Sequence, residues 1–353
     1  MLTELAIKEK GLVCQNCSGG KLSSTVNNSK QMLLCTKCKA SYPVLDDTPL
    51  MYISSNSNES DIKQDIQVFW KDLYHNAYSE HESLNQHTLP DLIDKLKEMF
   101  FARNHLAVHE MPISELKDKK VLEVGCGAGA HSSLFCKEGA KITSLDLTVD
   151  RVIATKKKLE IIDKSNSSFV LQGDAENLPF EDNFFDIVYS NGVLHHTPNT
   201  QKSIEEVRRV LKPGGSAVIM LYAKHSYLYW INIFFLRGII LGNIFRHSNW
   251  LGRTTEWMSS SKQTIYNPET KVYSNKEILH LFSDFKSINV RKSSFVFQQL
   301  PFIGKIISFL LSKNSEINPA GKLVYGHEWR HETKFELYLG RYIGFNLNII
   351  AKK

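Results

Sequence analysis

The chain of 353 residues lacks several features that would assign its class directly. Two apolar segments, Ser226–Leu236 and Gly238–Phe245, are much shorter than the ~20 residues of a membrane-spanning helix. The first ten residues contain acids and lack the apolar stretch of a secretory signal. A Gly-x-x-x-x-Gly-Lys-Ser/Thr loop is also absent, which argues against a nucleoside triphosphate site. We therefore expect a cytoplasmic protein without a transmembrane segment.

Strong basic charge is missing too. The net charge is +6, and residues 1–50 contain six Lys, no Arg and one aromatic residue, Tyr42. A nucleic-acid surface usually combines basic charge with stacking aromatic rings. Nucleic acid is therefore a possible partner, but it is not favoured. The length predicts two or three domains, and a hydrophobic fraction of 42% is enough for a sizeable core.

The most informative motif runs from Val121 to Ala130. A predicted buried strand, Val121–Val124, leads into the turn Gly125-Cys126-Gly127-Ala128-Gly129, and a helix follows at Ser132–Lys137. Glycines permit positive φ and let the backbone approach a ligand closely. The spacing also fits a dinucleotide-binding loop, so this motif alone leaves more than one adenosine cofactor open.

Acidic residues follow the next strands. The predicted strand Lys141–Leu145 ends at Asp146, 23 residues after Glu123, where a carboxylate can accept hydrogen bonds from both hydroxyls of a ribose. A third strand, Phe169–Gln172, precedes Gly173-Asp174-Ala175-Glu176. A fourth strand and a turn before a fifth are expected at Phe184–Asn191 and Lys212–Gly215.

With these four motifs in this order, residues 119–222, about 30% of the chain, resemble the core of class I S-adenosylmethionine (SAM)-dependent methyltransferases, in the branch that includes quinone-biosynthesis enzymes. The resemblance implies an α/β fold with a doubly wound, seven-stranded, mostly parallel sheet and an antiparallel C-terminal hairpin. SAM carries a sulfonium and an amino group but no phosphate, so carboxylates and carbonyls suit its site.

The resemblance also implies roles for single residues. Glu123 would bind the amino group of SAM, directly or through water, and Asp146 would hold the ribose. Asp174 would accept from the adenine amino group, and Asn191 would line the floor near the sulfonium. The complete cofactor-binding set is Glu123, Gly125, Gly127, Asp146, Leu147, Asp174, Ala175 and Asn191.

Four of the six cysteines form a second motif. Cys14 and Cys17, and then Cys35 and Cys38, give the spacing C-x2-C-x17-C-x2-C, which is typical of a zinc ribbon. Two such knuckles place four thiolates in a closed tetrahedral shell, so we expect a structural zinc. The metal would stabilise a module too small to bury much apolar surface. Two disulfides are the alternative, less expected without a secretion signal.

The end of this module, Ser41–Met51, strengthens the assignment. Residues 11–52 resemble a zinc-ribbon family that activates tRNA and protein methyltransferases, and versions of that ribbon are fused to bacterial methyltransferases. This likeness raises the possibility of a substrate in the translation apparatus. Because basic and aromatic residues are few, we favour a packing or regulatory module over an RNA-binding one.

Two helical segments lie between the ribbon and the glycine motif. A polar linker is expected at Asn56–Asp61. The helix Asp65–Tyr78 has two faces with aromatic residues, one of them formed by Trp70, Tyr74 and Tyr78. In related methyltransferases such a segment closes over SAM, and aromatic rings attract a sulfonium cation. Core packing is the alternative. A second helix is expected at Pro90–Met111.

About 130 residues follow Tyr222. Ser226–Leu236, Gly238–Phe245 and Pro301–Leu311 are apolar helix candidates, either buried as a lid or exposed to a hydrophobic substrate or a membrane surface. Ser274 and Glu277 form a capping box that begins a helix through Phe282. The closing antiparallel strands are expected at Phe285–Val290 and Gly344–Ile350.

His327-Glu328-Trp329-Arg330-His331 matches the H-E-x-x-H signature of zinc proteases. Arg330 occupies an inner position of the motif and no third ligand follows, so we reject a protease. His327, Glu328 and His331 are instead candidate acid/base or recognition groups, with a structural or surface role as the alternative.

Two histidines follow the predicted fourth strand, where the acceptor site of the resembled family opens. A hydroxyl acceptor needs a base to remove its proton. His196 is the leading candidate for this catalytic role and His195 the second, while a structural role stays open. The Asn-Pro-Pro-Tyr motif of DNA amino-group methyltransferases is replaced by Asn191-Gly192-Val193-Leu194, which argues against a DNA adenine enzyme.

The sequence therefore predicts a zinc ribbon at 1–55, a helical lid at 56–115, a SAM-binding core at 116–222, and a substrate cap with closing strands at 223–353. The predicted activity is methyl transfer from SAM to a small, apolar or lipid-like acceptor. One alternative is a tRNA, rRNA or translation-factor methyltransferase that docks through its ribbon. The other is a SAM-binding subunit without catalysis.

Overall fold

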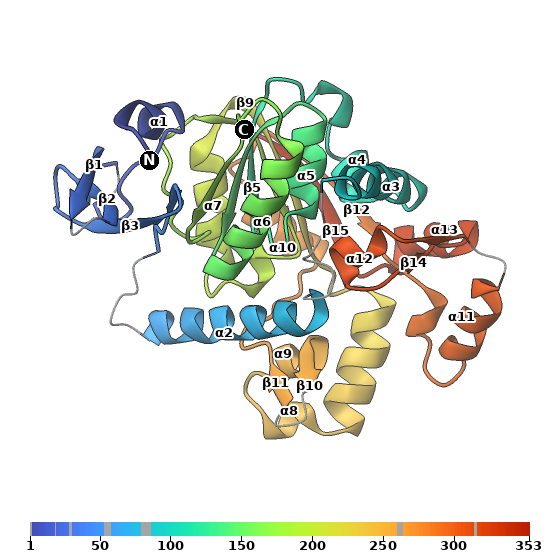
Figure 1. Cartoon of the computed structure of the whole chain (residues 1–353). Helices are drawn as coiled ribbons and strands as arrows, with labels where there is room; N and C mark the ends of the chain where they lie inside the picture. The colour runs from blue at the N-terminus through green and yellow to red at the C-terminus, as the bar shows by residue number, and fades with distance from the viewer. Residues whose placement is uncertain are drawn as a thin grey trace.

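The computed structural model describes residues 2–17, 19–27, 30–52, 58–78, 86–259, 264–313 and 316–353. A central sheet carries helices on both faces (Figure 1). The N-terminal segment with the four cysteines, called the ribbon segment below, adjoins one edge of the fold, and helices from the C-terminal third lie below the sheet in this view.

The central sheet has seven strands in the order β12-β15-β9-β8-β5-β6-β7. The five strands from β9 to β7 are parallel, whereas β15 pairs antiparallel with β9 and β12. This confirms the predicted doubly wound fold with an antiparallel C-terminal hairpin. The bounds are Lys120–Val124 (β5), Lys141–Asp146 (β6), Phe169–Gln172 (β7), Phe185–Asn191 (β8), Leu211–Tyr222 (β9), Ser287–Ser293 (β12) and Asn346–Lys352 (β15).

Neighbouring side chains along a strand point to opposite faces of the sheet, and here both faces carry apolar side chains. Val121 joins one buried cluster and Leu122 the other. The cluster containing Leu122 includes helices Thr200–Val210 (α7) and Asn275–Leu281 (α10). The opposite cluster includes Leu89–Ala102 (α3), Leu106–His109 (α4), Ala130–Lys137 (α5), Val149–Ile162 (α6) and Gly321–Tyr325 (α12).

The predicted turn at Lys212–Gly215 interrupts strand pairing. Phe185 lies opposite Leu211, but Ile187 lies opposite Ser216, so residues 212–215 leave the ladder. Gly214 has φ 79°, a conformation that suits glycine. The segment thus has the structural role expected of it.

The ribbon segment contains helix Glu4–Glu9 (α1) and a four-stranded sheet in the order β1-β2-β3-β4. These strands span Leu22–Asn27, Lys30–Cys35, Ser41–Leu45 and Thr48–Pro49. Leu33 and Tyr42 are fully buried in the apolar cluster that also contains Leu122 of the central sheet. The ribbon is therefore packed onto the rest of the protein, and the predicted division of the chain into four domains stays a prediction.

Helix α2 runs from Asn58 to Tyr78 and begins seven residues before the predicted helix, inside the expected linker. Residues 56 and 57 of that linker, and the side chain of Tyr78, lie outside the described residues. The single helix predicted at Pro90–Met111 is wrong, because α3 ends at Ala102 and α4 begins at Leu106. Asn104 adopts φ 52° between them, and the His105 side chain caps α4.

The apolar cap segments form helices with shifted ends. Residues Leu228–Ile240 form one π-helix (η4), which includes Arg237 and so joins parts of the two apolar segments. Gly242, at φ 72°, separates η4 from Asn243–Arg246 (α8). Arg237 fits within the helix because its guanidinium donates to the Thr254 carbonyl at 2.5 Å. Among the described residues, none of the helices combines the length and hydropathy that a bilayer crossing requires.

The remaining cap elements lead to the closing hairpin. They are Trp250–Thr255 (α9), Trp257–Ser259 (β10), Thr264–Tyr266 (β11), Phe297–Gln299 (η5), Gly304–Ser312 (α11), Ile317–Asn318 (β13), Trp329–Arg330 (β14) and Lys334–Ile343 (α13). The capping box of Ser274 and Glu277 is present at the start of α10, as predicted. The H-E-x-x-H motif lies around strand β14 instead of on a helix, in agreement with its rejection as a protease signature.

Candidate functional site

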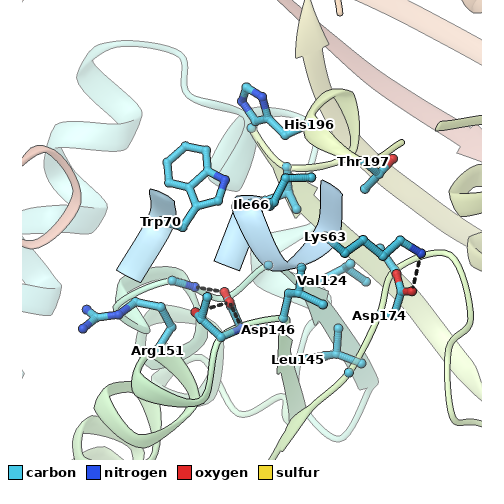
Figure 2. A pocket seen from close by; sticks show the side chains of 18 of the residues that line it. Lys63, Ile66, Trp70, Val124, Leu145, Asp146, Arg151, Asp174, His196 and Thr197 are labelled. Carbon is cyan, nitrogen blue, oxygen red and sulfur yellow. Dashed lines mark hydrogen bonds and ion pairs between the residues drawn. The ribbon is translucent and has the colours of Figure 1, made fainter. Parts of the chain in front are cut away.

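The largest concentration of predicted site residues lines one pocket at the carboxyl ends of β5, β6 and β8 (Figure 2). It encloses about 860 Å³, part of it open to solvent, which falls in the size range of small-molecule sites. Eight of the predicted site residues line it: Gly125, Gly127, Asp146, Leu147, Asp174, Ala175, Asn191 and His196. Glu123 and His195 lie outside the lining.

The glycine loop is shaped by close contacts. Gly125 has φ 78°, and a Cβ there would lie 2.3 Å from the Val193 side chain. Gly127 has φ 52°, and a Cβ there would lie 2.5 Å from Oη of Tyr74 on α2. Both glycines are therefore required by conformation and by space. The second contact places α2 directly against the loop.

Asp146, at the end of β6, holds the glycine loop through hydrogen bonds. Its Oδ2 accepts from the Gly127 N–H at 2.9 Å, and its Oδ1 accepts from the backbone and hydroxyl of Thr148 at 2.9 and 2.7 Å. Burial raises the pKa of Asp146, although these hydrogen bonds oppose the shift. The carboxylate is thus held at the mouth of β6 with its orientation fixed.

Asp174 is paired with a cation from α2. Lys63 Nζ lies 2.6 Å from Asp174 Oδ2 and 2.7 Å from Glu176 Oε2, and Figure 2 shows Lys63 reaching across the pocket. Burial alone would lower the pKa of Lys63, but the two carboxylates raise it. The lysine therefore stays charged and joins α2 to the loop after β7.

Helix α2 forms the roof of the pocket through Ile66, Trp70 and Tyr74 as well as Lys63. The Trp70 ring contacts the His196 ring edge to face, with centroids 5.3 Å apart. The pocket thus has a polar floor formed by strand ends and an aromatic roof. Aromatic faces in such a roof attract a cationic ligand.

His196 is held by residues that follow β9. Its Nδ1 lies 2.9 Å from the Glu269 carbonyl, and its Nε2 lies 3.3 Å from Glu256 Oε2. Glu256 also accepts from Oη of Tyr222 at 2.6 Å and from Nδ2 of Asn267 at 2.5 Å. Burial favours the neutral carboxyl, but His196 and these donors hold the pKa of Glu256 below its usual value.

Asn191 ends β8 in the pocket floor. Its Oδ1 is buried and has no hydrogen-bond partner within the part of the chain that the structure describes. A buried carbonyl oxygen without a partner is costly unless a ligand or water satisfies it. The unpaired Asn191 Oδ1 therefore indicates a ligand that brings a cation or a hydrogen-bond donor to this position.

Glu123 and His195 lie elsewhere. The Glu123 carboxylate is buried behind the glycine loop, where Oε2 accepts from the Ser132 hydroxyl and Oε1 lies 3.5 Å from His131 Nδ1. His195 is fully buried and its ring stacks on Tyr222, with centroids 3.8 Å apart. Burial lowers the pKa of His195 far below its usual value, so its ring is neutral.

Comparison with known proteins identifies the segment that holds this pocket. A family model described as a methyltransferase domain matches residues 122–219. Residues 122–219 are thus similar to a methyltransferase domain. The loop, both strand-end carboxylates and Asn191 all lie within it.

Curated relatives are similar to part of the chain. Sterol 4-C-methyltransferase of Caenorhabditis elegans is 28% identical over 38% of this chain and 40% of that protein. Phthiotriol/phenolphthiotriol dimycocerosates methyltransferase of Mycobacterium tuberculosis is 40% identical over 29% of this chain and 37% of that protein. Malonyl-[acyl-carrier protein] O-methyltransferase of Buchnera aphidicola is 28% identical over 58% and 78%. The chain thus spans about two fifths of the first two relatives.

The cysteine cluster adjoins the methyltransferase domain. Its four ligand atoms all lie within 4.8 Å of one another, with Cys14 and Cys38 sulfurs 3.5 Å apart and Cys17 and Cys35 sulfurs 3.6 Å apart. A Cβ at Gly20 would lie 2.6 Å from two of the sulfurs, so glycine leaves room for the cluster. Free thiolates in this arrangement fit a tetrahedral zinc with bonds of about 2.3 Å.

The ribbon touches the loop that carries Asp174. Asn177 donates to the Gln15 carbonyl at 3.2 Å, and Gln15 Nε2 donates back to the Asn177 carbonyl. Met51 N–H donates to the carbonyl of Gln172, the last residue of β7, at 2.9 Å. The cysteine module therefore supports one wall of the pocket.

Several residues of the site carry no sequence signal. Lys63 resembles an ordinary surface lysine of an amphipathic helix, although it reaches two acids more than 100 residues away. Glu256 and Asn267 follow no motif and meet His196 only through the fold of the cap. His327, Glu328 and His331 do not line the pocket, and Glu328 pairs with Lys322 at 2.9 Å.

Proposed function

We propose that this protein transfers the methyl group of SAM to a small, apolar or lipid-like acceptor. The observation that carries the proposal is the pocket itself. It brings the glycine loop, Asp146, Asp174 and the unpartnered oxygen of Asn191 together inside the methyltransferase domain. Together these groups match a ligand that carries a ribose, an adenine and a cation.

The residues fit SAM in type and position. Asp146 would accept from the ribose hydroxyls, and Asp174 from the adenine amino group in place of Lys63. Asn191 Oδ1 would face the sulfonium, and Trp70 and Tyr74 would cover it. Glu123 would reach the amino group through water, because its side chain is behind the loop. Bound SAM supplies an electrophilic methyl group for in-line displacement.

The cap supports an apolar acceptor. One relative is named for a sterol and another for dimycocerosates, while a third is named for a malonyl group on a carrier protein. Residues after Tyr222 contact the pocket lining at His196, against which the Glu269 carbonyl and the Glu256 carboxylate lie. We infer that the acceptor enters from this side.

If the acceptor is a hydroxyl, the His196–Glu256 pair would take its proton. His196 Nδ1 would donate to the Glu269 carbonyl, so Nε2, which has no hydrogen-bond partner among the described residues, would take the proton, with Glu256 Oε2 3.3 Å away. A histidine oriented by a carboxylate is a common general base, because the carboxylate stabilises the imidazolium that forms. His195 has no access to the pocket lining, and we give it the role of a packing residue under Tyr222.

The ribbon would hold a structural zinc and serve as a packing module. Its buried residues belong to the core cluster of the sheet, and its Gln15 contacts the Asp174 loop. This arrangement supports a role in stabilising the adenine side of the pocket over docking of RNA.

Incubation with methyl-labelled SAM and a fractionated cell extract tests the proposal. We expect label in the fraction soluble in organic solvent and none in RNA or protein. Label in tRNA, rRNA or a translation factor would favour the docking alternative. SAM binding without labelling of any fraction would favour a non-catalytic subunit. The Asp146→Ala variant serves as the inactive control.

A further inference from the structure

The cap exposes two apolar surfaces that the proposed chemistry does not use. The first lies on η4 and α8 and the second on α11 and the turn before it. We call them together the apolar cap face, and its exposed members are Phe235, Ile239, Ile240, Leu241, Phe245, Phe302, Ile303, Ile306, Phe309 and Leu310. Phe302 is 92% exposed and Phe245 is 77% exposed. Soluble monomers rarely expose so many large apolar side chains together.

The two surfaces adjoin. Asn232 Nδ2 of η4 donates to the carbonyl of Gln299 in η5, five residues before α11 begins. In Figure 1, η4 lies below the sheet and α11 lies to its right, both away from the N-terminal segment. The helices that carry the two apolar surfaces are therefore neighbours in the cap.

The charged side chains in the two stretches of sequence around these surfaces are all basic. No Asp or Glu occurs in residues 226–255 or 285–315. Arg246, Lys305 and Lys313 are exposed beside the apolar side chains. An apolar surface with exposed cations beside it complements the interface of a bilayer with anionic headgroups.

The face is also connected to the pocket. Arg237 of η4 lies over the ring of Trp257, 4.6 Å from its centroid, and Trp257 follows Glu256 directly. Glu256 contacts His196 in the pocket lining. A surface bound to the apolar cap face would therefore lie close to the residues that we expect to bind the methyl acceptor.

We propose that the apolar cap face docks on an anionic lipid bilayer. Phe245 and Phe302 insert among the acyl chains, while Arg246, Lys305 and Lys313 bind headgroup phosphates. Docking would present an apolar acceptor dissolved in the membrane to the pocket, and this consequence rests on the proposed function. A second copy of the chain is a poorer occupant, because a symmetric interface would bring the same cations together.

Vesicle sedimentation of the full chain without SAM tests docking separately from methyl transfer. We expect binding to phosphatidylcholine vesicles that contain phosphatidylglycerol and weak binding to phosphatidylcholine alone. Phe245→Ser with Phe302→Ser should lower the partition coefficient about 100-fold, since each exposed phenyl ring loses its burial. Lys305→Gln with Lys313→Gln should lower it about 25-fold on anionic vesicles only.

Matched controls lie outside the face. Phe101 on α3 is 51% exposed, and Lys157 on α6 is exposed. Phe101→Ser and Lys157→Gln should leave vesicle binding unchanged. Equal losses from these controls, or no vesicle binding by the wild type, would overturn the proposal. So would a dimer in sedimentation velocity that Phe245→Ser with Phe302→Ser converts to a monomer, because the face would then join two copies.

Discussion

Asp146 offers the sharpest test of the pocket, because its carboxylate has two separable duties. It holds the glycine loop through Gly127 N–H and the following turn through Thr148, and it would accept both ribose hydroxyls of SAM. We consider Asp146→Ala, which removes both duties, and Asp146→Asn, which keeps the shape and one oxygen. The comparison separates loss of ligand contacts from collapse of the loop.

The magnitudes follow from the hydrogen bonds. Each bond to a charged group contributes about 1.5–3 kcal/mol, so losing two ribose contacts should weaken SAM binding by at least 100-fold. Asp146→Ala also leaves the buried donors of Gly127 and Thr148 without their acceptor, at about 1–3 kcal/mol each. Asp146→Asn should cost less stability while still losing most of the affinity.

Calorimetric titration with SAM measures the affinity, and thermal unfolding without SAM measures the stability. Asp150→Ala is the control, since Asp150 is an exposed acid four residues away whose surface pair with Lys71 spans 3.6 Å. Metal analysis should find the same zinc content in all variants. An unchanged SAM dissociation constant in Asp146→Ala would refute the assignment of the ribose site.

Three further expectations concern the cap, the ribbon and a buried histidine. Glu256→Gln should lower kcat about 100-fold or more for a hydroxyl acceptor without changing the SAM dissociation constant; an unchanged kcat would remove the base from the account. Purified protein should contain one zinc, and its removal by chelator should lower Tm by roughly 10 °C, whereas less than half an equivalent of zinc would count against the ribbon. Because burial lowers the pKa of His195, the unfolded chain binds a proton there below pH ~6.5 and the folded chain does not, so stability should fall by about 1.4 kcal/mol per pH unit as pH decreases. His195→Phe should remove that part of the slope in denaturant titrations at pH 5.5 and 7, and an identical slope would contradict the buried neutral ring.

The sheet and most of the pocket could be predicted because their signals are local. Buried parallel strands are short apolar runs; β5 ends at Val124, just before Gly125, and β6 ends at Asp146, where turn chemistry marks the boundary. The cysteine spacing likewise predicts a cluster of four cysteines, and their ligand atoms do lie within 4.8 Å of one another. These patterns need only a few neighbouring residues.

Other features depend on tertiary structure. Glu256 meets His196 across 60 residues, and Lys63 meets Asp174 across 111, so no local pattern joins them. The break of the predicted helix at Asn104 has a weak signal, since Asn tolerates positive φ, but the apolar periodicity continues past it. The π-helix η4 includes Arg237 because Thr254 accepts from it, a contact that sequence alone does not reveal.

The central claim is that the pocket under α2 binds SAM. Calorimetric titration of the wild-type chain with SAM tests it most directly. We expect one SAM site per chain. The affinity for SAM should be lost in a Trp70→Ala variant, which opens the roof of the pocket, and retained in a Leu5→Ala variant on the distant helix α1. Heat from more than one site, or no binding of SAM by the folded wild-type protein, would contradict it.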